Sequence, residues 1–301
     1  MSQVPSPIAP VFDGGGTILL PPPGASSVQF SNSQSSQPGI APTQVFGTDG
    51  ADILSFSSAT TGIEITAAGG NDSILGGSGD DVIAAGEGAD TVFGGAGNDQ
   101  IFGGQGNDLI FGGEGDDRIE AGDGDDVVAG GAGADTIFGG AGADSISGDD
   151  GDDLIFGNQD ADLLQGGAGN DVIYGGQGAD TIQGGSGNDT LFGDKGNDRL
   201  EDTAGGTDAF GFSYAGADDA DTVIGFEAGT DKILLVGDVF ASLGASVEDS
   251  EFTAVDAESQ RGDADTPLVY VRETGELYFE GELVATFAEV PDITTGEFEL
   301  F

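Results

Sequence analysis

Apolar and polar positions follow a nine-residue period over the central part of the chain. From Ala67 to Glu201 the pattern is G-G-x-G-x-D-x-U-x, where U is a large aliphatic residue, and it repeats fifteen times without a change of register. Position eight of every unit is Ile, Val or Leu, from Ile74 to Leu200. Because such residues favour strands, the pattern predicts one short strand in each unit.

The other positions of the unit predict how these strands are connected. Glycine dominates the first four positions, which predicts a turn because glycine accepts positive φ. Two units then form a flattened coil of 18 residues, with one three-residue strand in each of two parallel sheets, and the coils stack at roughly 4.8 Å. Position eight points away from its strand neighbours, so the aliphatic side chains meet between the sheets. We expect an all-β fold, a right-handed parallel β-roll (a β-solenoid with two sheets of short strands) with an all-β C-terminal cap.

The segments that flank the repeats differ from them in composition. Residues 1–46 are rich in Pro, Ser and Gln and predict an extended or flexible N-terminal arm. Residues 47–66 predict an irregular N-terminal coil, with Asp52 at the aspartate position. Residues 202–301 predict a β cap and secretion region with a loop at 238–266 and strands at Asp221–Phe226, Lys232–Val236, Leu268–Arg272, Glu276–Phe279 and Leu283–Phe287.

The charge of the chain narrows the classes of partner. It has 55 acidic and 6 basic residues, for a formal net charge of −49, so a compact state needs bound cations. This charge disfavours nucleic acid and anionic membrane surfaces as partners. The chain has no Cys and no His, which excludes thiolate and imidazole as nucleophile, base or metal ligand. Oxygen ligands for a hard metal ion remain.

The acidic residues are placed at one phase of the repeat. Position six is Asp in all fifteen units, and Glu never replaces it, unlike the mixture expected of a solvated acidic face. These residues are Asp72, Asp81, Asp90, Asp99, Asp108, Asp117, Asp126, Asp135, Asp144, Asp153, Asp162, Asp171, Asp180, Asp189 and Asp198.

Stacking of the coils brings these carboxylates together in pairs. Turns 18 residues apart lie above one another, so that Asp99 and Asp117 flank one gap and repel each other unless a cation lies between them. Ca²⁺ takes six to eight oxygens and accepts backbone carbonyls beside carboxylates. We therefore predict Ca²⁺ as the cofactor, in about thirteen inter-turn sites. The carbonyls of turn glycines complete these sites, for example those of Gly95, Gly97, Gly104, Gly106, Gly113, Gly115, Gly131 and Gly133.

In three units, Asp or Asn replaces a glycine of the turn. Asp149, Asn158 and Asp194 replace glycine at position two, and Asp160 replaces it at position four. Asp and Asn tolerate the left-handed region better than other residues with a side chain. We expect positive φ at these four positions.

Aromatic residues recur at position nine of one sheet and predict a candidate contact face. The spacing of 18 residues aligns Phe102, Phe138, Phe156, Tyr174 and Phe192, with Glu120 interrupting the series. Two interpretations stay open. The rings stack on one another or lie under the arm, or they contact another copy of the chain, with Thr17–Leu20 or Val28–Phe30 as an added strand.

The unit Gly103–Phe111 (GGQGNDLIF) resembles the RTX (repeat-in-toxin) nonapeptide, a calcium-binding repeat of parallel β-rolls. Residues 206–236 resemble the flank that closes the roll in secreted members of this family, and residues 268–301 resemble their C-terminal secretion region. The resemblance implies export by a Gram-negative type I secretion machinery, with folding on calcium outside the cell. Phe298–Phe301 is either part of that signal or a strand of the cap.

Other sequence features bear on location and catalysis. The N-terminus lacks the positive and apolar regions of a Sec signal, and no apolar stretch is long enough to predict a transmembrane segment. No H-E-x-x-H or histidine-based triad is present, so we expect no catalytic residues. Two functions remain: a structural or adhesive cell-surface protein that self-assembles as an oligomer or filament, or an accessory calcium-binding module that acts on an extracellular polysaccharide or a separate enzyme.

Overall fold

The structure is a computed structural model of the 301-residue chain. It describes residues 43–57, 59–216, 218–243, 247, 252–255 and 266–300, together with three short strands among the first 42 residues. The chain divides into two compact units, residues 1–148 and 149–301, and each is described by itself. The division falls within β15 (Ser145–Asp150).

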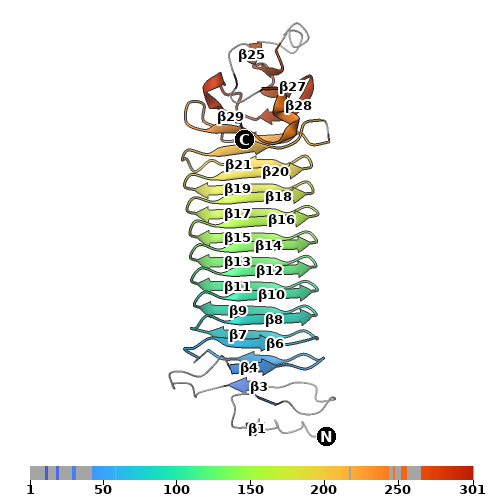
Figure 1. Cartoon of the computed structure of the whole chain (residues 1–301), viewed down its shortest axis with the longest axis vertical. Coiled ribbons are helices and arrows are strands. Elements are labelled where there is room, and N and C mark those ends of the chain that lie inside the picture. Colours follow the sequence, from blue (N-terminus) through green and yellow to red (C-terminus); the bar gives the residue numbers. More distant parts are fainter. Residues whose placement is uncertain are drawn as a thin grey trace. The chain divides into compact units, whose positions relative to one another are not determined.

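In the first unit, the even- and odd-numbered strands from β3 onwards form two separate sheets (Figure 1). One sheet contains β4 (Thr43–Phe46), β6 (Ile63–Thr66), β8 (Val82–Glu87), β10 (Gln100–Gln105), β12 (Arg118–Asp123) and β14 (Thr136–Ala141). The other contains β3 (Gln29–Ser31), β5 (Ile53–Ser55), β7 (Ser73–Gly77), β9 (Thr91–Ala96), β11 (Leu109–Glu114) and β13 (Val127–Ala132). Neighbouring strands are parallel from β4 to β14 in the first of these sheets and from β3 to β13 in the second.

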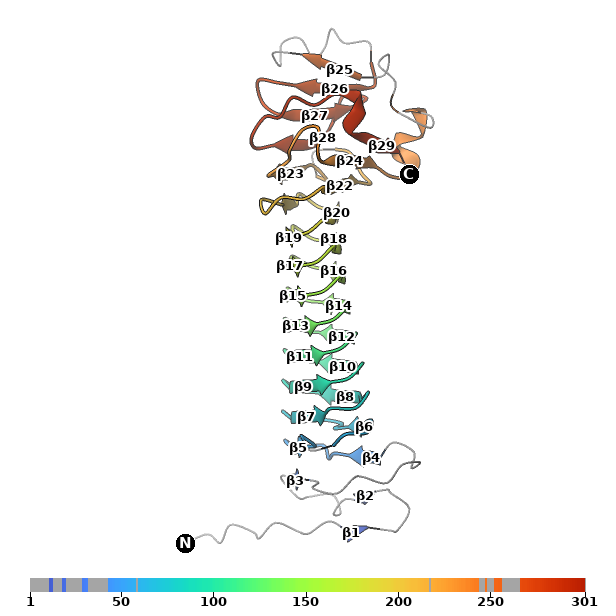
Figure 2. The same ribbon diagram turned by 90° about the vertical axis from the view of Figure 1, so that its left-hand side faces the viewer.

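The second unit continues the same pattern and then departs from it. Its first sheet contains β16 (Leu154–Gln159), β18 (Val172–Gln177), β20 (Thr190–Lys195), β22 (Ala209–Phe212), β24 (Lys232–Leu235) and β29 (Phe298–Leu300), all parallel. Its second sheet contains β17 (Leu163–Ala168), β19 (Thr181–Ser186), β21 (Arg199–Glu201), β23 (Asp221–Ile224), β28 (Glu282–Phe287), β27 (Glu276–Phe279), β26 (Leu268–Val271) and β25 (Phe252–Val255). Strands β26, β27 and β28 form an antiparallel meander that lies beside β23 (Figure 2).

The 18-residue coil is visible in the strand register. Ile101 is paired with Ile119 and Ile119 with Ile137, so position eight of one coil lies beside position eight of the next. These three side chains are fully buried between the sheets. The predicted fold class, an all-β parallel β-solenoid whose aliphatic column forms the core, is confirmed.

The strands are longer than the three residues predicted from the sequence. β10 has six residues, because its pairing with β12 continues through Gly104 and Gly122 to Gln105. Beyond the strand, the Gly106 N–H donates to the carbonyl of Asp123 at 2.7 Å. Residues without a side chain allow this close backbone approach, and the ladder therefore extends into the turn.

Position one of the repeat faces inwards together with position eight. Ala85 and Ala121 occupy this position on β8 and β12 and are fully buried, two residues after the buried Ile83 and Ile119. The interior of the roll is therefore lined by an aliphatic column and, beside it, by a column of Gly and Ala next to the turns.

An aromatic cluster forms the core at the C-terminal end of the second unit. The ring of Phe226 lies 5.9 Å from that of Phe210 and 5.2 Å from that of Phe287, and Tyr270 packs edge-on against Phe287. The strands predicted at residues 221, 232, 268, 276 and 283 are all present, within a few residues of the predicted bounds. Aromatic and β-branched residues favour these strands.

The prediction of a loop over residues 238–266 is wrong in part. Asp238–Leu243 forms a short 3-10 helix and Phe252–Val255 forms β25, which pairs in parallel with β26. The acidic composition of the region predicted a loop, but the short apolar segment of β25 forms a strand because it pairs with β26. The rest of this stretch lies outside the described residues.

Most of the predicted N-terminal arm also lies outside the described residues. Within it, β1 (Val11–Phe12) pairs antiparallel with β2 (Ile18–Leu19), and β3 pairs in parallel with β5. Among the described residues, no helix is long and apolar enough to span a membrane.

Candidate metal sites

All fifteen position-six aspartates are buried where a turn meets the next strand. Their exposed fractions lie between 0 and 3%. Asp99, for example, directly precedes β10, and Asp108 directly precedes β11. An ionised carboxylate at such a position needs compensating partners.

In aspartates of both units, the first carboxylate oxygen, Oδ1, accepts a backbone N–H from the preceding coil. The N–H of Asp81 donates to Oδ1 of Asp99 at 2.7 Å, and the N–H of Asp99 donates to Oδ1 of Asp117 at 2.8 Å. The same bond recurs along both units with lengths of 2.7 to 2.9 Å. Within each unit, this ladder of hydrogen bonds therefore fixes Oδ1 of the aspartates that accept it.

The second oxygen, Oδ2, is buried but accepts no hydrogen bond among the described residues. This holds for Asp72, Asp81, Asp90, Asp99, Asp108, Asp117, Asp126, Asp171, Asp180, Asp189 and Asp198. Leaving a buried polar atom without a partner is costly, and a regular series of such atoms indicates a binding site for a cation.

The Oδ2 atoms point towards the glycine at position one of their own turn. A Cβ atom added to Gly103 would lie 2.6 Å from Oδ2 of Asp108, and one added to Gly94 would lie 2.7 Å from the carbonyl oxygen of Gly112 in the next coil. The space beside these glycines is therefore bordered by a carboxylate oxygen from one turn and a carbonyl oxygen from the turn above it.

Burial changes the acidity of these groups. Burial raises the pKa of Asp108 to about 7, which the N–H of Asp90 opposes and the charges of Asp126 and Asp90 reinforce. Burial likewise raises the pKa values of Asp81 and Asp117 to about 7. The metal-free site therefore disfavours the charged state that a cation would stabilise.

The donor set fits calcium. Carboxylate and carbonyl oxygens border the site, and the chain has neither Cys nor His to favour zinc. Ca²⁺ accepts irregular sets of oxygen ligands, whereas Mg²⁺ requires a tight octahedron. The aspartates would hold the ion through Oδ2, and the turns would supply carbonyls.

The turn conformation is as predicted. Positive φ is found at Gly95, Gly97, Gly104, Gly106, Gly113, Gly115, Gly131 and Gly133, the glycines expected to present carbonyl ligands. It is also found at the four substituted positions, Asp149, Asn158, Asp160 and Asp194, with φ between 65° and 80°. The role of the turn glycines as carbonyl ligands remains a proposal.

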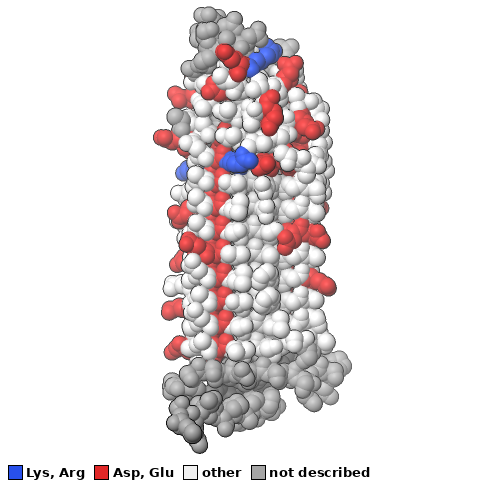
Figure 3. Space-filling view, turned by 180° about the vertical axis from the view of Figure 1, so that it is seen from behind, with Lys and Arg blue, Asp and Glu red and all other residues white. Residues whose placement is uncertain are grey.

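A second ladder at position five runs in the opposite direction. The N–H of Asn98 donates to Oδ1 of Asp80 at 3.0 Å, and the N–H of Asp116 donates to Oδ1 of Asn98 at 3.1 Å. These side chains are exposed, unlike the position-six aspartates. Acidic side chains gather in a narrow column on one face, with few basic side chains nearby (Figure 3).

Sequence reasoning assigned no metal role to five aspartates that continue the column beyond the fifteen units. Asp52, Asp208, Asp221 and Asp231 each accept or donate the same inter-coil hydrogen bond, and Asp202 lies beside Asp189. Their signal was the spacing Asp-x-apolar: Leu54, Phe210, Val223 and Ile233 follow the first four by two residues and are all fully buried.

The outermost of these aspartates differ from the inner ones. Oδ2 of Asp52 accepts the N–H of Thr48 at 2.6 Å, and Oδ2 of Asp231 accepts the N–H of Glu227 at 2.7 Å. A local backbone donor thus satisfies the second oxygen at either end of the series. For inner aspartates such as Asp108 and Asp117, no described residue donates to Oδ2, which leaves that oxygen available to a cation.

The position-nine aromatic residues have different neighbours in the two units. In the second unit Tyr174 stacks on Phe156 at 5.1 Å and on Phe192 at 4.9 Å, so the stacking interpretation holds for these three rings. In the first unit the Arg118 guanidinium lies 4.6 Å from the ring centre of Phe138, and Phe102 lies beside Ala84 and Glu120.

Phe192 is too buried to take part in the candidate contact face. Its exposed fraction is only 8%. The ring packs against Gly211, where any Cβ would clash with it. The C-terminal flank therefore covers this end of the series.

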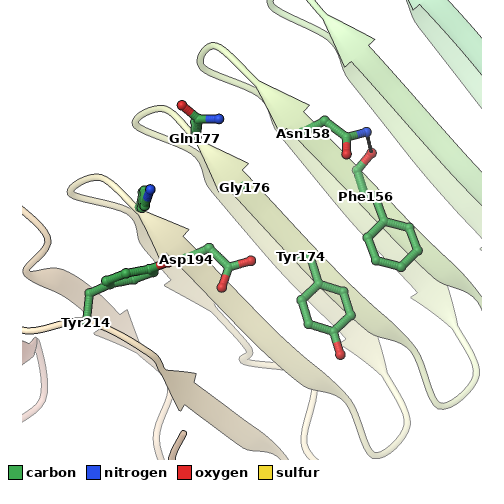
Figure 4. A pocket seen from close by; sticks show the side chains of 8 residues that line it. Phe156, Asn158, Tyr174, Gly176, Gln177, Asp194 and Tyr214 are labelled. Carbon is green, nitrogen blue, oxygen red and sulfur yellow. Dashed lines mark hydrogen bonds between the residues drawn. The ribbon is translucent and has the colours of Figure 1, made fainter. Parts of the chain in front are cut away.

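A groove of about 340 Å³ lies beside the remaining rings of the second unit. Phe156, Tyr174 and Tyr214 line it together with the polar residues Asn158, Gln177, Asp194 and Lys195 (Figure 4). The Lys195 ammonium lies 5.6 Å from the ring centre of Tyr214. The groove thus combines aromatic surface with hydrogen-bonding groups.

Comparison with known proteins agrees with this geometry. Residues 66–101, 93–128, 102–137, 129–164 and 165–200 match the family described as RTX calcium-binding nonapeptide repeat (4 copies). No curated protein matches the chain. The solved structure of the AlgE6R3 subunit of the mannuronan C5-epimerase from Azotobacter vinelandii is similar to it, with 19% identity over 58% of this chain and 78% of that one, and a TM-score of 0.27. A TM-score this low supports no inference from that protein to this one.

The family match bears on the cofactor and the location. RTX nonapeptide repeats bind calcium, and proteins that contain them are typically secreted. The match covers the fifteen-unit region in which the aspartate column and the aliphatic core run in register. Residues 66–200 of this chain are therefore a calcium-binding repeat region of the RTX family.

Proposed function

We propose that this chain is a secreted protein whose β-roll folds when Ca²⁺ binds between its turns outside the cell. The observation that carries the proposal is the series of buried Oδ2 atoms without hydrogen-bond partners among the described residues. Without cations these carboxylates repel one another in a chain of net charge −49. Metal binding and folding then become one transition.

The proposal includes about thirteen inter-turn sites, each built from position-six aspartates and turn carbonyls. Ions in all of them would offset about half of the negative charge, so the calcium-loaded protein stays acidic and soluble. Low calcium inside a cell would keep the repeats open for export through a type I secretion machinery. Millimolar calcium outside would then fold them.

A calcium titration tests this proposal. Protein treated with EGTA should have the circular dichroism of a disordered chain, and added Ca²⁺ should convert it cooperatively to a β signal. Magnesium at the same concentration is the control and should not produce this conversion. A roll that is fully folded in EGTA at neutral pH would overturn the proposal.

For the role of the folded roll, we favour a structural or adhesive function at the cell surface with self-assembly of copies. The support is the aromatic surface at position nine of the sheet that contains β10 and β14, where Phe102 and Phe138 are partly exposed. Replacing Phe102 and Phe138 by Ser should reduce calcium-dependent assembly, measured by light scattering. Unchanged scattering would count against a contact through these rings.

The groove of the second unit favours the alternative, an accessory module that binds an extracellular polysaccharide. Aromatic rings beside a few polar groups are typical of ligand sites, and Tyr174 and Tyr214 border this groove together with Lys195. Tyr214→Ala should weaken binding to an oligosaccharide array, whereas Phe111→Ala removes a ring outside the groove and should not. Equal binding by both variants and the parent chain would argue against the groove as the binding site.

A further inference from the structure

One group of three carboxylates stands out from the repeat sites within the described part of the chain. Oxygens of Asp189, Asp202 and Asp208 all lie within 4.8 Å of one another, and all three residues are buried. Asp189 is the position-six residue of the fourteenth unit. Asp208 takes the corresponding place one coil later, because its Oδ1 accepts the N–H of Asp189 at 3.0 Å.

Asp202 is the member that makes this group different. It follows the last complete unit and occupies position one of the next turn, where the repeat has Gly or Ala. In a repeat site such as that of Gly94, the neighbour contributed by position one of the following coil is the carbonyl oxygen of Gly112. At Gly184, the corresponding neighbour is the Oδ2 atom of Asp202.

The two free oxygens converge on one point. A Cβ added to Gly184 would lie 2.7 Å from Oδ2 of Asp189 and closer still to Oδ2 of Asp202. Both Oδ2 atoms are buried and accept no hydrogen bond from the described residues, whereas Oδ1 of Asp202 accepts the N–H of Ala204 at 3.3 Å. Asp202 and Asp189 are 3% and 1% exposed.

We propose that Asp189, Asp202 and Asp208 form a calcium site of three carboxylates at the C-terminal end of the repeat region, which favours ions of high charge more strongly than the sites between repeats. The proposal rests on the proposed calcium binding of the roll. Each repeat site has two aspartates and a carbonyl at this place, so the third carboxylate adds one full negative charge. Attraction to an ion grows with the product of the charges, and the affinity of oxygen sites for Ca²⁺ follows their charge.

The mutual effect of these groups supports the assignment. Burial, followed by the charge of Asp208 and the proximity of Asp189, raises the pKa of Asp202 to about 8. Three carboxylates in this arrangement are costly without a cation. A metal ion beside Gly184 would therefore explain why three carboxylates are buried together near the end of the regular coils.

Exchange with terbium tests the proposal in protein that stays folded. Full-length protein is loaded with saturating Ca²⁺, and Tb³⁺ is added while its luminescence is followed. A site with an extra carboxylate prefers the trivalent ion, so one equivalent of Tb³⁺ should exchange with an affinity at least about tenfold above that of the others. A single class of exchanging sites would overturn the proposal.

Two variants and a matched control test whether the Tb³⁺ ion that exchanges with the highest affinity, the strong equivalent, binds at Asp202. Asp202→Gly restores the residue of the repeat, and Asp202→Asn removes the charge with little change of shape. Both should lose the strong equivalent and keep the remaining ones. Asp160→Gly also removes one charge and restores a repeat glycine, but Asp160 is exposed and lies beside Gly178, outside the group of three carboxylates, so this variant should keep the strong equivalent. Retention of the strong equivalent in both Asp202 variants would overturn the assignment.

The outcome is separable from that of the proposed function. A parent chain that binds no calcium at millimolar concentration would defeat the calcium-binding function itself. A chain that folds with calcium but exchanges terbium in one class would defeat the three-carboxylate site and leave the function standing.

Discussion

Oδ1 of Asp108 accepts the backbone N–H of Asp90 at 2.8 Å, while Oδ2 of the same carboxylate is buried beside Gly103 and accepts no hydrogen bond from the described residues. The two oxygens of one side chain therefore have separate tasks. One fixes the stacking of two coils, and the other faces the space that we assign to an ion. This separation makes the two tasks open to independent tests.

Asp108→Asn separates them. The amide oxygen can still accept the N–H of Asp90, but the amide nitrogen that replaces Oδ2 cannot bind a cation. We expect the number of bound Ca²⁺ ions to fall by one or two and the calcium midpoint of folding to rise. Equilibrium dialysis and circular dichroism measure these quantities.

Asp116→Asn is the control for this variant. Asp116 is exposed at position five, and its Oδ1 accepts the N–H of Ala134 at 3.0 Å, which an amide oxygen can also do. The same charge is lost outside the site, so the number of bound ions should be unchanged. Equal losses in both variants would show that net charge, and not the position-six oxygen, controls binding.

Ile137→Ala tests the aliphatic core. Ile137 is fully buried and paired with Ile119 in the neighbouring coil. Removing its buried methyl groups should lower the free energy of unfolding by about 2–5 kcal/mol, measured by denaturant titration at fixed saturating calcium. Thr136→Ala, at the partly exposed neighbour, should change it by far less. Similar effects of both changes would mean that position eight does not form a close-packed core.

Much of the fold follows from the period of the sequence. A strict nine-residue repeat with Ile101, Ile119 and Ile137 in phase requires a coil length that is a multiple of nine, and 18 residues give two sheets that face each other across the aliphatic column. Burial of the position-six aspartates follows as well, because they stand two residues before these side chains and share their side of the strand.

Other features depend on contacts that a repeat pattern does not contain. The role of Asp202 was not visible because Gly205 and Gly206 break the period after the last unit, and only the fold places Asp202 and Asp208 beside Asp189. Burial of Phe192 likewise depends on Gly211, which lies outside the repeats. Long-range pairing at the end of the roll therefore limited the prediction.

Two neighbouring glycines should respond differently to the same substitution. Gly104 has φ of 117°, and a Cβ there would clash with the carbonyl of Gly86. Gly104→Ala should therefore cost about 1–3 kcal/mol for the backbone conformation alone. Gly103 has no positive φ, and the coils on either side carry Ala85 and Ala121 at its position.

We therefore expect Gly103→Ala to lose less stability than Gly104→Ala, because its Cβ meets Oδ2 of Asp108 and the carbonyl of Ala121 without the strain of a positive φ. Thermal unfolding of both variants in saturating calcium measures the difference, and Gly104→Ala should melt well below Gly103→Ala. A comparable loss in the two variants would contradict the assignment of backbone strain to position two of the repeat.

Protonation of the position-six aspartates should stabilise the metal-free roll and so replace part of the effect of calcium. Burial raises the pKa values of Asp81, Asp108 and Asp117 from 3.8 to about 7, so the metal-free folded state binds more protons than the unfolded chain between these limits. Its stability must then increase as the pH falls through about 7 and level off below about 4. In EGTA, the β signal in circular dichroism should be stronger at pH 5 than at pH 8.

Calcium affinity should move in the opposite direction, because protons compete with the ion for the same Oδ2 atoms. The Ca²⁺ concentration at the folding midpoint should be higher at pH 5 than at pH 8, although the metal-free roll is more stable at pH 5. Measurements at pH 5 stay above the isoelectric point of about 4.1, where precipitation would interfere. A metal-free β signal that weakens on acidification would mean that the column carboxylates are ionised in the folded chain, and that burial does not oppose their charge.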